Sequence, residues 1–146
     1  MPQIKRSQTT RFLSISIGLV YLWFGGLKYF SGFSPAEQLA QDTIAVLTFD
    51  LIPPNYSILL LALWESLVGI SLLIKSSRTT LQLALLHILL TFTPVFFFPE
   101  RCFVELPFKF TLLGQYIFKN IIILAALLQL YRLSKKNSYG YQSMER

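Results

Sequence analysis

The sequence YSILLLALWESLVGISLLI, at residues 56–74, carries a single charge, Glu65. An α-helix needs about 20 mostly apolar residues to cross the ~30 Å hydrocarbon core of a bilayer. Three further stretches have a similar length and composition, at residues 12–30, 80–98 and 110–131. Together the four stretches fill most of the 146-residue chain, which excludes a soluble globular enzyme. The pattern predicts an all-α, polytopic membrane protein built as a four-transmembrane-helix bundle.

The composition supports the same class of protein. Charged residues make up 14% of the chain, whereas soluble proteins average about 25%. The mean hydropathy is +0.54, the formal net charge is +6 and the isoelectric point is near 9.6. A basic soluble domain would suggest nucleic acid as a partner. In this chain the charges separate by loop instead, and we expect the lipid bilayer as the partner and no nucleic acid.

The positions of the charges predict the orientation of the chain. The segments 1–11 and 132–146, with the loop between the second and third spans, hold nine basic residues and one acid. The other two loops hold three basic residues and five acids. Basic loops stay in the cytoplasm, and an even number of spans leaves both termini on one side. We therefore expect 1–11 and 132–146 to be cytoplasmic tails and 12–131 to be the transmembrane domain.

The first outer loop contains the signature of a short helix. Ser34-Pro35-Ala36-Glu37 combines an N-cap serine, a proline at the first helical position and a capping-box glutamate. Apolar residues follow at helical spacing, and the pair Pro53-Pro54 ends the segment. The pattern predicts an amphipathic helix over about residues 34–50, lying along the outer interface.

Two other features lie in or near the third span. Pro94 interrupts this span and removes the hydrogen bond to the carbonyl near Leu90, which the hydroxyl of Thr91 or Thr93 can replace. We expect a kink there. Cys102 is the single cysteine. A single cysteine excludes an internal disulfide and a CxxC pair. Cys102 can still form a disulfide with another protein.

Ionisable side chains inside apolar spans are costly and call for an explanation. Glu65 and Lys119 lie nine positions into their spans, and these two spans run in the same direction. Equal depth predicts an ion pair between them, or neutralisation of both. Lys28, near the outer end of the first span, can reach the same glutamate or extend to the headgroups. The pair has two interpretations, a contact that only locks the helices or a polar cavity for a ligand headgroup.

Three more polar residues complete the candidate ligand-binding or buried polar cluster. His87 lies near the middle of the third span, where it can relay protons, bind a quinone carbonyl or only bond a neighbouring helix. No second histidine or cysteine accompanies it in a span, so we expect no metal site. Gln115 and Asn120 flank Lys119, and we expect interhelical hydrogen bonds from both. No motif assigns a catalytic residue.

Short fragments of the chain, taken in order, resemble the DoxX-like family of redox-associated four-helix membrane proteins. They are GLVYLWFG (18–25), LKYF (27–30), SPAE (34–37), LIPP (51–54), WE (64–65) with Gly69 and the leucines 72–73, TFTP (91–94), FPE (98–100), GQYI (114–117) and KN (119–120). They extend over residues 18–120. One departure is Leu113, where the family pattern has an acid before the glycine of the fourth helix.

The resemblance implies a four-helix bundle in the plasma membrane, associated with quinone-linked or thiol-linked redox systems. With the buried polar cluster, it predicts a non-enzymatic subunit or accessory of a membrane redox system, with a polar intramembrane pocket for a quinone or lipid headgroup. A membrane protein or redox enzyme is the expected partner, and no cofactor is certain. The positions that the resemblance shares with this cluster include Lys28, Glu65, Gln115, Lys119 and Asn120. Two alternatives stay open: a small transporter or flippase-like protein with Glu65 as its protonatable site, and a scaffold or assembly factor for another membrane protein.

Overall fold

The structure is a computed structural model that describes the backbone of residues 2–105 and 107–142, with side chains from residue 8 to residue 134 except residue 106. The described chain is mostly helical, at 75%. Within it, four helices are long and apolar enough to span a membrane: Gln8–Leu27, Pro54–Ile74, Arg78–Phe97 and Leu112–Ser134. The predicted all-α class is confirmed at this level, and each helix covers most of one predicted span.

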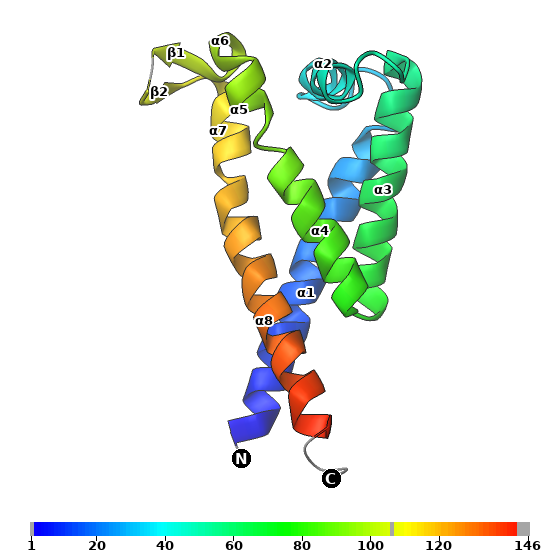
Figure 1. Ribbon diagram of the computed structural model, residues 1–146, viewed down its shortest axis with the longest axis vertical. Helices are drawn as coiled ribbons and strands as arrows, with labels where there is room; N and C mark the ends of the chain where they lie inside the picture. The colour runs from blue at the N-terminus through cyan, green and yellow to red at the C-terminus, as the bar shows by residue number, and fades with distance from the viewer. Residues whose placement is uncertain (1, 106, 143–146) are drawn as a thin grey trace.

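The long helices form an open bundle. Helix α1 (Pro2–Leu27) packs along α3 (Pro54–Ile74), while α4 (Arg78–Leu90) packs against both α3 and α8 (Asn120–Gln142). Helix α1 begins and α8 ends at the same end of the molecule (Figure 1). The helices continue into the segments 1–11 and 132–146, which the sequence predicted as tails.

Small residues let α1 and α3 approach closely. A Cβ atom added at Gly69 would lie 2.8 Å from Cγ of Leu22 and 2.9 Å from the carbonyl oxygen of Gly18. Glycines at such crossings bring two helix backbones together. The main apolar core lies beside this crossing and consists of Ile17, Tyr21, Val68, Leu72, Leu81, Ala84, Ile88, Leu127 and Leu130.

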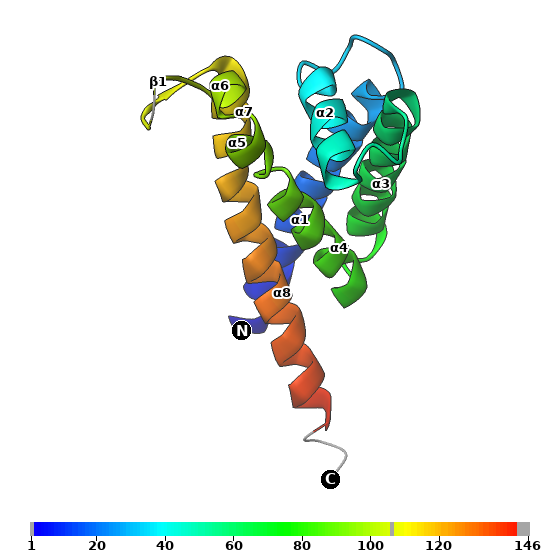
Figure 2. The same cartoon turned by 45° about the horizontal axis from the view of Figure 1, so that its top comes forward.

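Helix α2 (Glu37–Leu47) lies across the end of the bundle away from the termini (Figures 1 and 2). The helix predicted over 34–50 exists in shorter form, and its predicted capping box is wrong. The N-cap is Ala36, without a side-chain hydrogen bond. Glu37 instead accepts from the backbone N–H of Gly32 at 2.7 Å, because residues 34–37 form a turn before the helix begins. Pro54 starts α3, as expected for a proline at a first helical position.

The third span breaks where the sequence predicted a kink. Helix α4 ends at Leu90, and α5 (Pro94–Phe97) begins at the proline. The hydroxyl of Thr93 donates to the Leu90 carbonyl at 2.7 Å, which confirms the predicted compensation. In the fourth span, Lys119 lies between α7 (Leu112–Phe118) and α8 with helical backbone angles, so the helix continues from Leu112 to Ser134.

The second outer loop forms structure that the sequence did not predict. Helix α6 (Pro99–Cys102) leads into an antiparallel hairpin of β1 (Phe103–Glu105) and β2 (Lys109–Phe110). The hairpin returns the chain to α7 directly against α6. A Cβ atom added at Gly114 would lie 1.9 Å from the Cys102 carbonyl oxygen, so only glycine fits at this contact.

Candidate functional site

The central feature of the site is a buried ion pair between α1 and α3. Lys28 directly follows α1, and its Nζ atom lies 2.6 Å from Oε2 of Glu65. The lysine also donates to the backbone carbonyl of Phe24 at 3.2 Å. The side chains of Lys28 and Glu65 are 9% and 7% exposed. Each charge is therefore held away from solvent and neutralised by the other.

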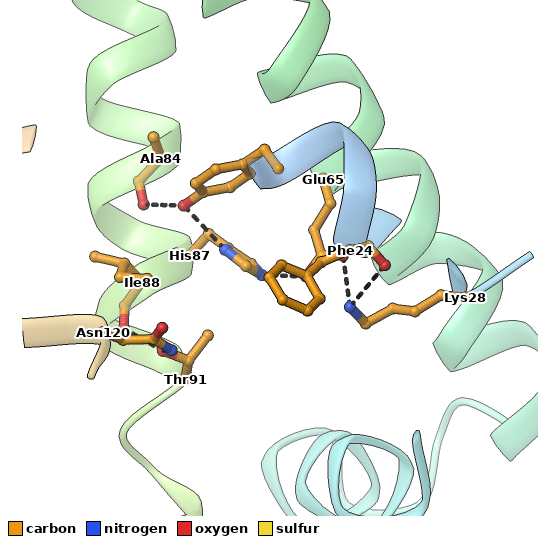
Figure 3. Close-up of polar contacts among 9 residues, drawn as sticks. Phe24, Lys28, Glu65, Ala84, His87, Ile88, Thr91 and Asn120 are labelled. Carbon is orange, nitrogen blue, oxygen red and sulfur yellow. Dashed lines mark hydrogen bonds and ion pairs between the residues drawn. The ribbon is translucent and has the colours of Figure 1, made fainter. Parts of the chain in front are cut away.

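The second carboxylate oxygen extends this pair into a chain of hydrogen bonds (Figure 3). Oε1 of Glu65 lies 3.2 Å from Nε2 of His87 on α4. The Nδ1 atom of the same ring lies 3.1 Å from the hydroxyl oxygen of Tyr21. That hydroxyl lies 3.0 Å from the backbone carbonyl of Ala84. Three helices thus contribute to one network, Tyr21–His87–Glu65–Lys28, which we call the polar chain.

Local packing explains why these side chains meet. Glu65 lies on the buried face of α3 with Ala62, Val68 and Gly69, at the three- and four-residue spacing of a helix face. A Cβ atom added at Gly25 would lie 3.0 Å from Cβ of Glu65. Glycine at that position therefore lets the end of α1 approach the glutamate. The aromatic rings of Tyr21 and His87 stack edge to face, with their centroids 5.3 Å apart.

The polar chain lines a cavity of about 740 Å³ between the helices. This volume lies within the ~300–1,000 Å³ range of small-molecule sites. The rest of the wall is mostly apolar and comes from α1, α2, α3, α4, α5, α7 and α8. Representative wall residues are Val20, Ile44, Leu60, Ile88, Pro94 and Ile123. The cavity thus combines a long apolar surface with one charged wall.

One hydrogen-bond donor at this cavity has no partner among the described residues. An ammonium group has three N–H donors, and that of Lys28 uses two, toward Glu65 and Phe24. Trp64 also lines the cavity, but its unpaired indole N–H is covered by protein atoms and does not face the cavity. Both oxygens of Glu65 are already engaged. The vacant hydrogen-bonding capacity of this wall therefore belongs to a donor, which fits an oxygen acceptor.

The structure corrects the predicted partner of Glu65. The ion pair with Lys119 is not formed among the described residues, because Lys28 and His87 occupy the carboxylate. Lys119 is exposed. Its ammonium lies 3.5 Å from the centroid of the Tyr116 ring, a cation–π contact that stabilises a positive charge. Equal depth along two helices did not bring the two charges into contact.

The remaining predicted residues lie apart from the ion pair. Asn120 donates to the hydroxyl of Thr91 at 3.2 Å, which confirms an interhelical bond and joins α8 to the break after α4. It also lines the cavity. Gln115 is exposed and lies 3.5 Å from the carbonyl of Phe110, within its own segment, so its predicted interhelical bond is not seen among the described contacts.

Sequence reasoning missed Tyr21 and the link from His87 to Glu65. Tyr21 shares a buried face of α1 with Ser14, Ile17, Gly18 and Gly25. These residues are three, four or seven positions from Tyr21, the spacing of one helix face. This spacing was a signal that Tyr21 points into the bundle. The sequence contained no signal for the His87–Glu65 contact, since the rotation of α4 against α3 depends on packing.

The end of the cavity away from the chain termini is covered by α2, which contacts α5 and α6. Arg101 of α6 forms an ion pair with Asp42 of α2. Beneath this pair, Leu39 of α2 packs with Cys102 and Ile117. Cys102 is fully buried. Burial, and to a lesser extent the carboxylate of Glu100, raises the pKa of the Cys102 thiol. A disulfide to another protein through Cys102 would thus require this end to open.

Among the described residues, no group of three or more His, Cys, Asp or Glu side chains is placed to hold a metal ion. Comparisons with protein-family models, with curated proteins and with solved structures find no match for this chain. The DoxX-like resemblance stays a prediction from the sequence. The function is therefore inferred from the cavity and the polar chain.

Proposed function

We propose that the protein is a DoxX-like, multi-pass protein of the plasma membrane that binds the head of a quinone or lipid in its cavity. In this role it serves a membrane redox system as a non-enzymatic subunit. The observation that carries the proposal is the cavity of about 740 Å³, in which an apolar wall meets the paired charges of Lys28 and Glu65. Amphiphiles have the same division between a long apolar body and a polar head. The redox role rests on the sequence resemblance alone.

The outer surface of the helices supports a place in the bilayer. On α3, Leu59, Leu63, Leu67 and Ile70 are between 45% and 56% exposed, and they follow one another at three- or four-residue spacing. Large exposed apolar patches are rare on soluble monomers and mark contact with a membrane or a partner. Lipid chains fit such a surface, because the row extends along a helix long enough to span the hydrocarbon core.

The site chemistry favours a ligand head that accepts hydrogen bonds. The vacant donor of Lys28 fits a carbonyl or another oxygen acceptor. The apolar wall fits an isoprenoid or acyl chain. A quinone carries carbonyl oxygens on an apolar body and meets both requirements.

Tryptophan fluorescence tests this function directly. Trp64 lines the cavity, whereas Trp23 is 67% exposed on the outside of α1. In the Trp23→Phe variant, Trp64 is the single reporter, and we expect saturable quenching by decylubiquinone in phosphatidylcholine nanodiscs. In the matched Trp64→Phe variant, the exposed Trp23 is quenched only by quinone dissolved in the lipid. This quenching should increase linearly with decylubiquinone concentration, without saturation. Equal, unsaturable quenching of both variants would contradict a quinone site.

A second set of variants tests the polar head group. In the Trp23→Phe background, the changes Lys28→Met and Glu65→Gln remove the charges while leaving the apolar wall in place. We expect weaker decylubiquinone quenching, with circular dichroism confirming that the helices remain. If both variants bind like their parent, the ion pair serves only to lock the helices.

One observation favours the transporter alternative enough to test it. The break after Leu90 lies next to the junction of α7 and α8 at Lys119, and the Asn120–Thr91 hydrogen bond joins the two. A broken helix is a common feature of secondary transporters. A proteoliposome assay of pH-driven flux distinguishes the two functions. Quinone binding without any proton-coupled flux would leave the binding function and remove the transporter.

A further inference from the structure

We propose that the polar chain is a proton-binding site that takes up one proton when an anionic amphiphile enters the cavity. The ligand is an apolar chain with a singly charged oxygen head, such as a carboxylate or sulfonate. The proposal rests on the proposed function only in taking the cavity as the ligand site. It adds the charge of the ligand and the group that compensates it.

In the resting state, every hydrogen bond from Tyr21 to Lys28 is made without an extra proton, and the one hydrogen of the Tyr21 hydroxyl is not available to the Ala84 carbonyl. Lys28 is an ammonium and Glu65 a carboxylate, 2.6 Å apart. Neutral His87 carries its proton on Nε2 and donates to Oε1 of Glu65. Its Nδ1 then accepts from the Tyr21 hydroxyl at 3.1 Å. The charges of this wall sum to zero.

The same heavy-atom positions accommodate one more proton. When Nδ1 of His87 is protonated, it donates to the Tyr21 oxygen, which is both a donor and an acceptor. The Tyr21 hydroxyl then turns its hydrogen toward the Ala84 carbonyl, 3.0 Å away. The imidazolium keeps its bond to Glu65 through Nε2. Loading therefore requires a proton from water and the rotation of one hydroxyl, and no covalent bond between heavy atoms changes.

The charge balance explains why an anion would bring this proton. Lys28 is the single lysine or arginine among the described residues that line the cavity, and Glu65 already neutralises it. An uncompensated ion in an apolar environment is strongly disfavoured. Protonated His87 supplies the missing positive charge within the same network. Binding one anion together with one proton leaves the wall and ligand neutral overall.

The vacant hydrogen-bonding group determines where the anion binds. The third N–H of Lys28 is the vacant donor at the cavity. It fits an oxygen head, and bonds from an ammonium to an anionic oxygen are among the stronger hydrogen bonds. We therefore place the head beside Lys28 and the chain along the apolar wall.

The other titratable groups around His87 do not replace it in this role. Tyr21 and Lys28 face it from the α1 side, and Glu65 faces it from α3. From α7, Tyr116 lines the same cavity, and the Lys119 ammonium lies on the Tyr116 ring without lining the cavity. No acidic residue of α2 lines the cavity among the described residues. His87 is the group among these with a ring nitrogen that can either accept a hydrogen bond from the Tyr21 hydroxyl or donate one to it.

Calorimetric titration of decane-1-sulfonate tests the coupling, because a sulfonate keeps its charge at every working pH. The full-length protein is held in zwitterionic phosphatidylcholine nanodiscs, and empty nanodiscs correct for partitioning into lipid. We expect the affinity to rise by up to about tenfold for each unit that the pH falls, since one linked proton gives this slope. Decan-1-ol, which has the same chain without the charge, should bind without pH dependence.

Variants identify the proton site. His87→Gln keeps an amide that can bond Glu65 but cannot take up a proton, so its sulfonate affinity should become independent of pH. Tyr21→Phe removes the acceptor of the Nδ1 proton, so the sulfonate affinity should depend less steeply on pH than in the wild-type protein. Tyr29→Phe removes a hydroxyl that bonds Ser66 on the exposed surface, and it should keep the wild-type slope.

The outcomes separate this proposal from the proposed function. Absence of saturable sulfonate binding, a pH-independent wild-type affinity or an unchanged slope in His87→Gln would each overturn the proton site, even if decylubiquinone quenches Trp64 saturably. Proton-coupled sulfonate binding without quinone quenching would support the proton site and contradict the quinone ligand.

Discussion

Nζ of Lys28 and Oε2 of Glu65 lie 2.6 Å apart, although the residues are 37 positions apart in the sequence and belong to different helical segments. This contact joins the outer end of α1 to the middle of α3 and directs the second oxygen of Glu65 toward His87. The charged wall of the cavity depends on this relationship.

Removing one partner of this pair should cost more stability than removing both. Glu65→Ala leaves the Lys28 charge buried, and we expect a loss of about 3–5 kcal/mol in unfolding free energy. The double variant Lys28→Met/Glu65→Gln leaves no buried charge and should recover most of that loss. Unfolding in mixed detergent micelles measures both values. A double variant as unstable as Glu65→Ala would show that the pair does not neutralise a buried charge.

Gly114 should be intolerant of a side chain. Gly114→Ala places a Cβ atom 1.9 Å from the backbone oxygen of Cys102, so α7 must shift away from α6. We expect a destabilisation of at least ~1–3 kcal/mol, typical of overpacking. Gly26→Ala is the control, because a Cβ atom there meets nothing within 4 Å and alanine is the better helix former. The thermal unfolding midpoint should therefore fall in Gly114→Ala and rise in Gly26→Ala.

The ion pair between Asp42 and Arg101 should affect access to the cavity more than stability. These side chains are 35% and 39% exposed, so Arg101→Gln should cost under about 1 kcal/mol. Because the pair connects α2 to α6 over the end of the cavity away from the chain termini, its loss should speed decylubiquinone quenching of Trp64 in stopped-flow experiments. High salt should produce the same acceleration in the wild-type protein and none in Arg101→Gln. Identical rates in the two proteins at low salt would show that α2 does not limit entry.

Cys102 should react slowly with maleimide in the folded protein. Its side chain is fully buried, and its raised pKa keeps the thiol protonated at pH values where a free cysteine has begun to ionise. Labelling should therefore begin at a higher pH than for the exposed control Gln38→Cys in a Cys102→Ala background. Denaturation should make the two rates equal. Rapid labelling of native Cys102 at neutral pH would contradict the burial.

The orientation of the chain is open to a direct test. Because basic residues concentrate in the terminal segments and the loop between α3 and α4, reporters fused to either terminus should both report the cytoplasm. A reporter inserted in the loop after α2 should report the opposite side. Reporters that place the two termini on different sides would contradict an even number of spans.

The sequence predicted the elements that depend on local composition. Apolar length alone located the four helices that are long and apolar enough to span a membrane, since a helix bonds its backbone polar groups within its own segment. The effect of Pro94 on Leu90 was also predictable, because a missing N–H and a nearby threonine hydroxyl are neighbours in the chain. The Ser34 capping box failed because its residues were better satisfied in a turn, with Glu37 bonded to Gly32.

Only the tertiary structure decided which polar side chains meet. Position in a span determines the depth of a residue, but the rotation of each helix about its own axis comes from packing against its neighbours. Glu65 and Lys119 share a predicted depth and do not pair. Gly25 instead lets α1 approach α3, and Lys28 forms the ion pair with Glu65. The rotation of α4 then brings His87 between Glu65 and Tyr21. Composition thus determined the helices, and close packing between them determined the site.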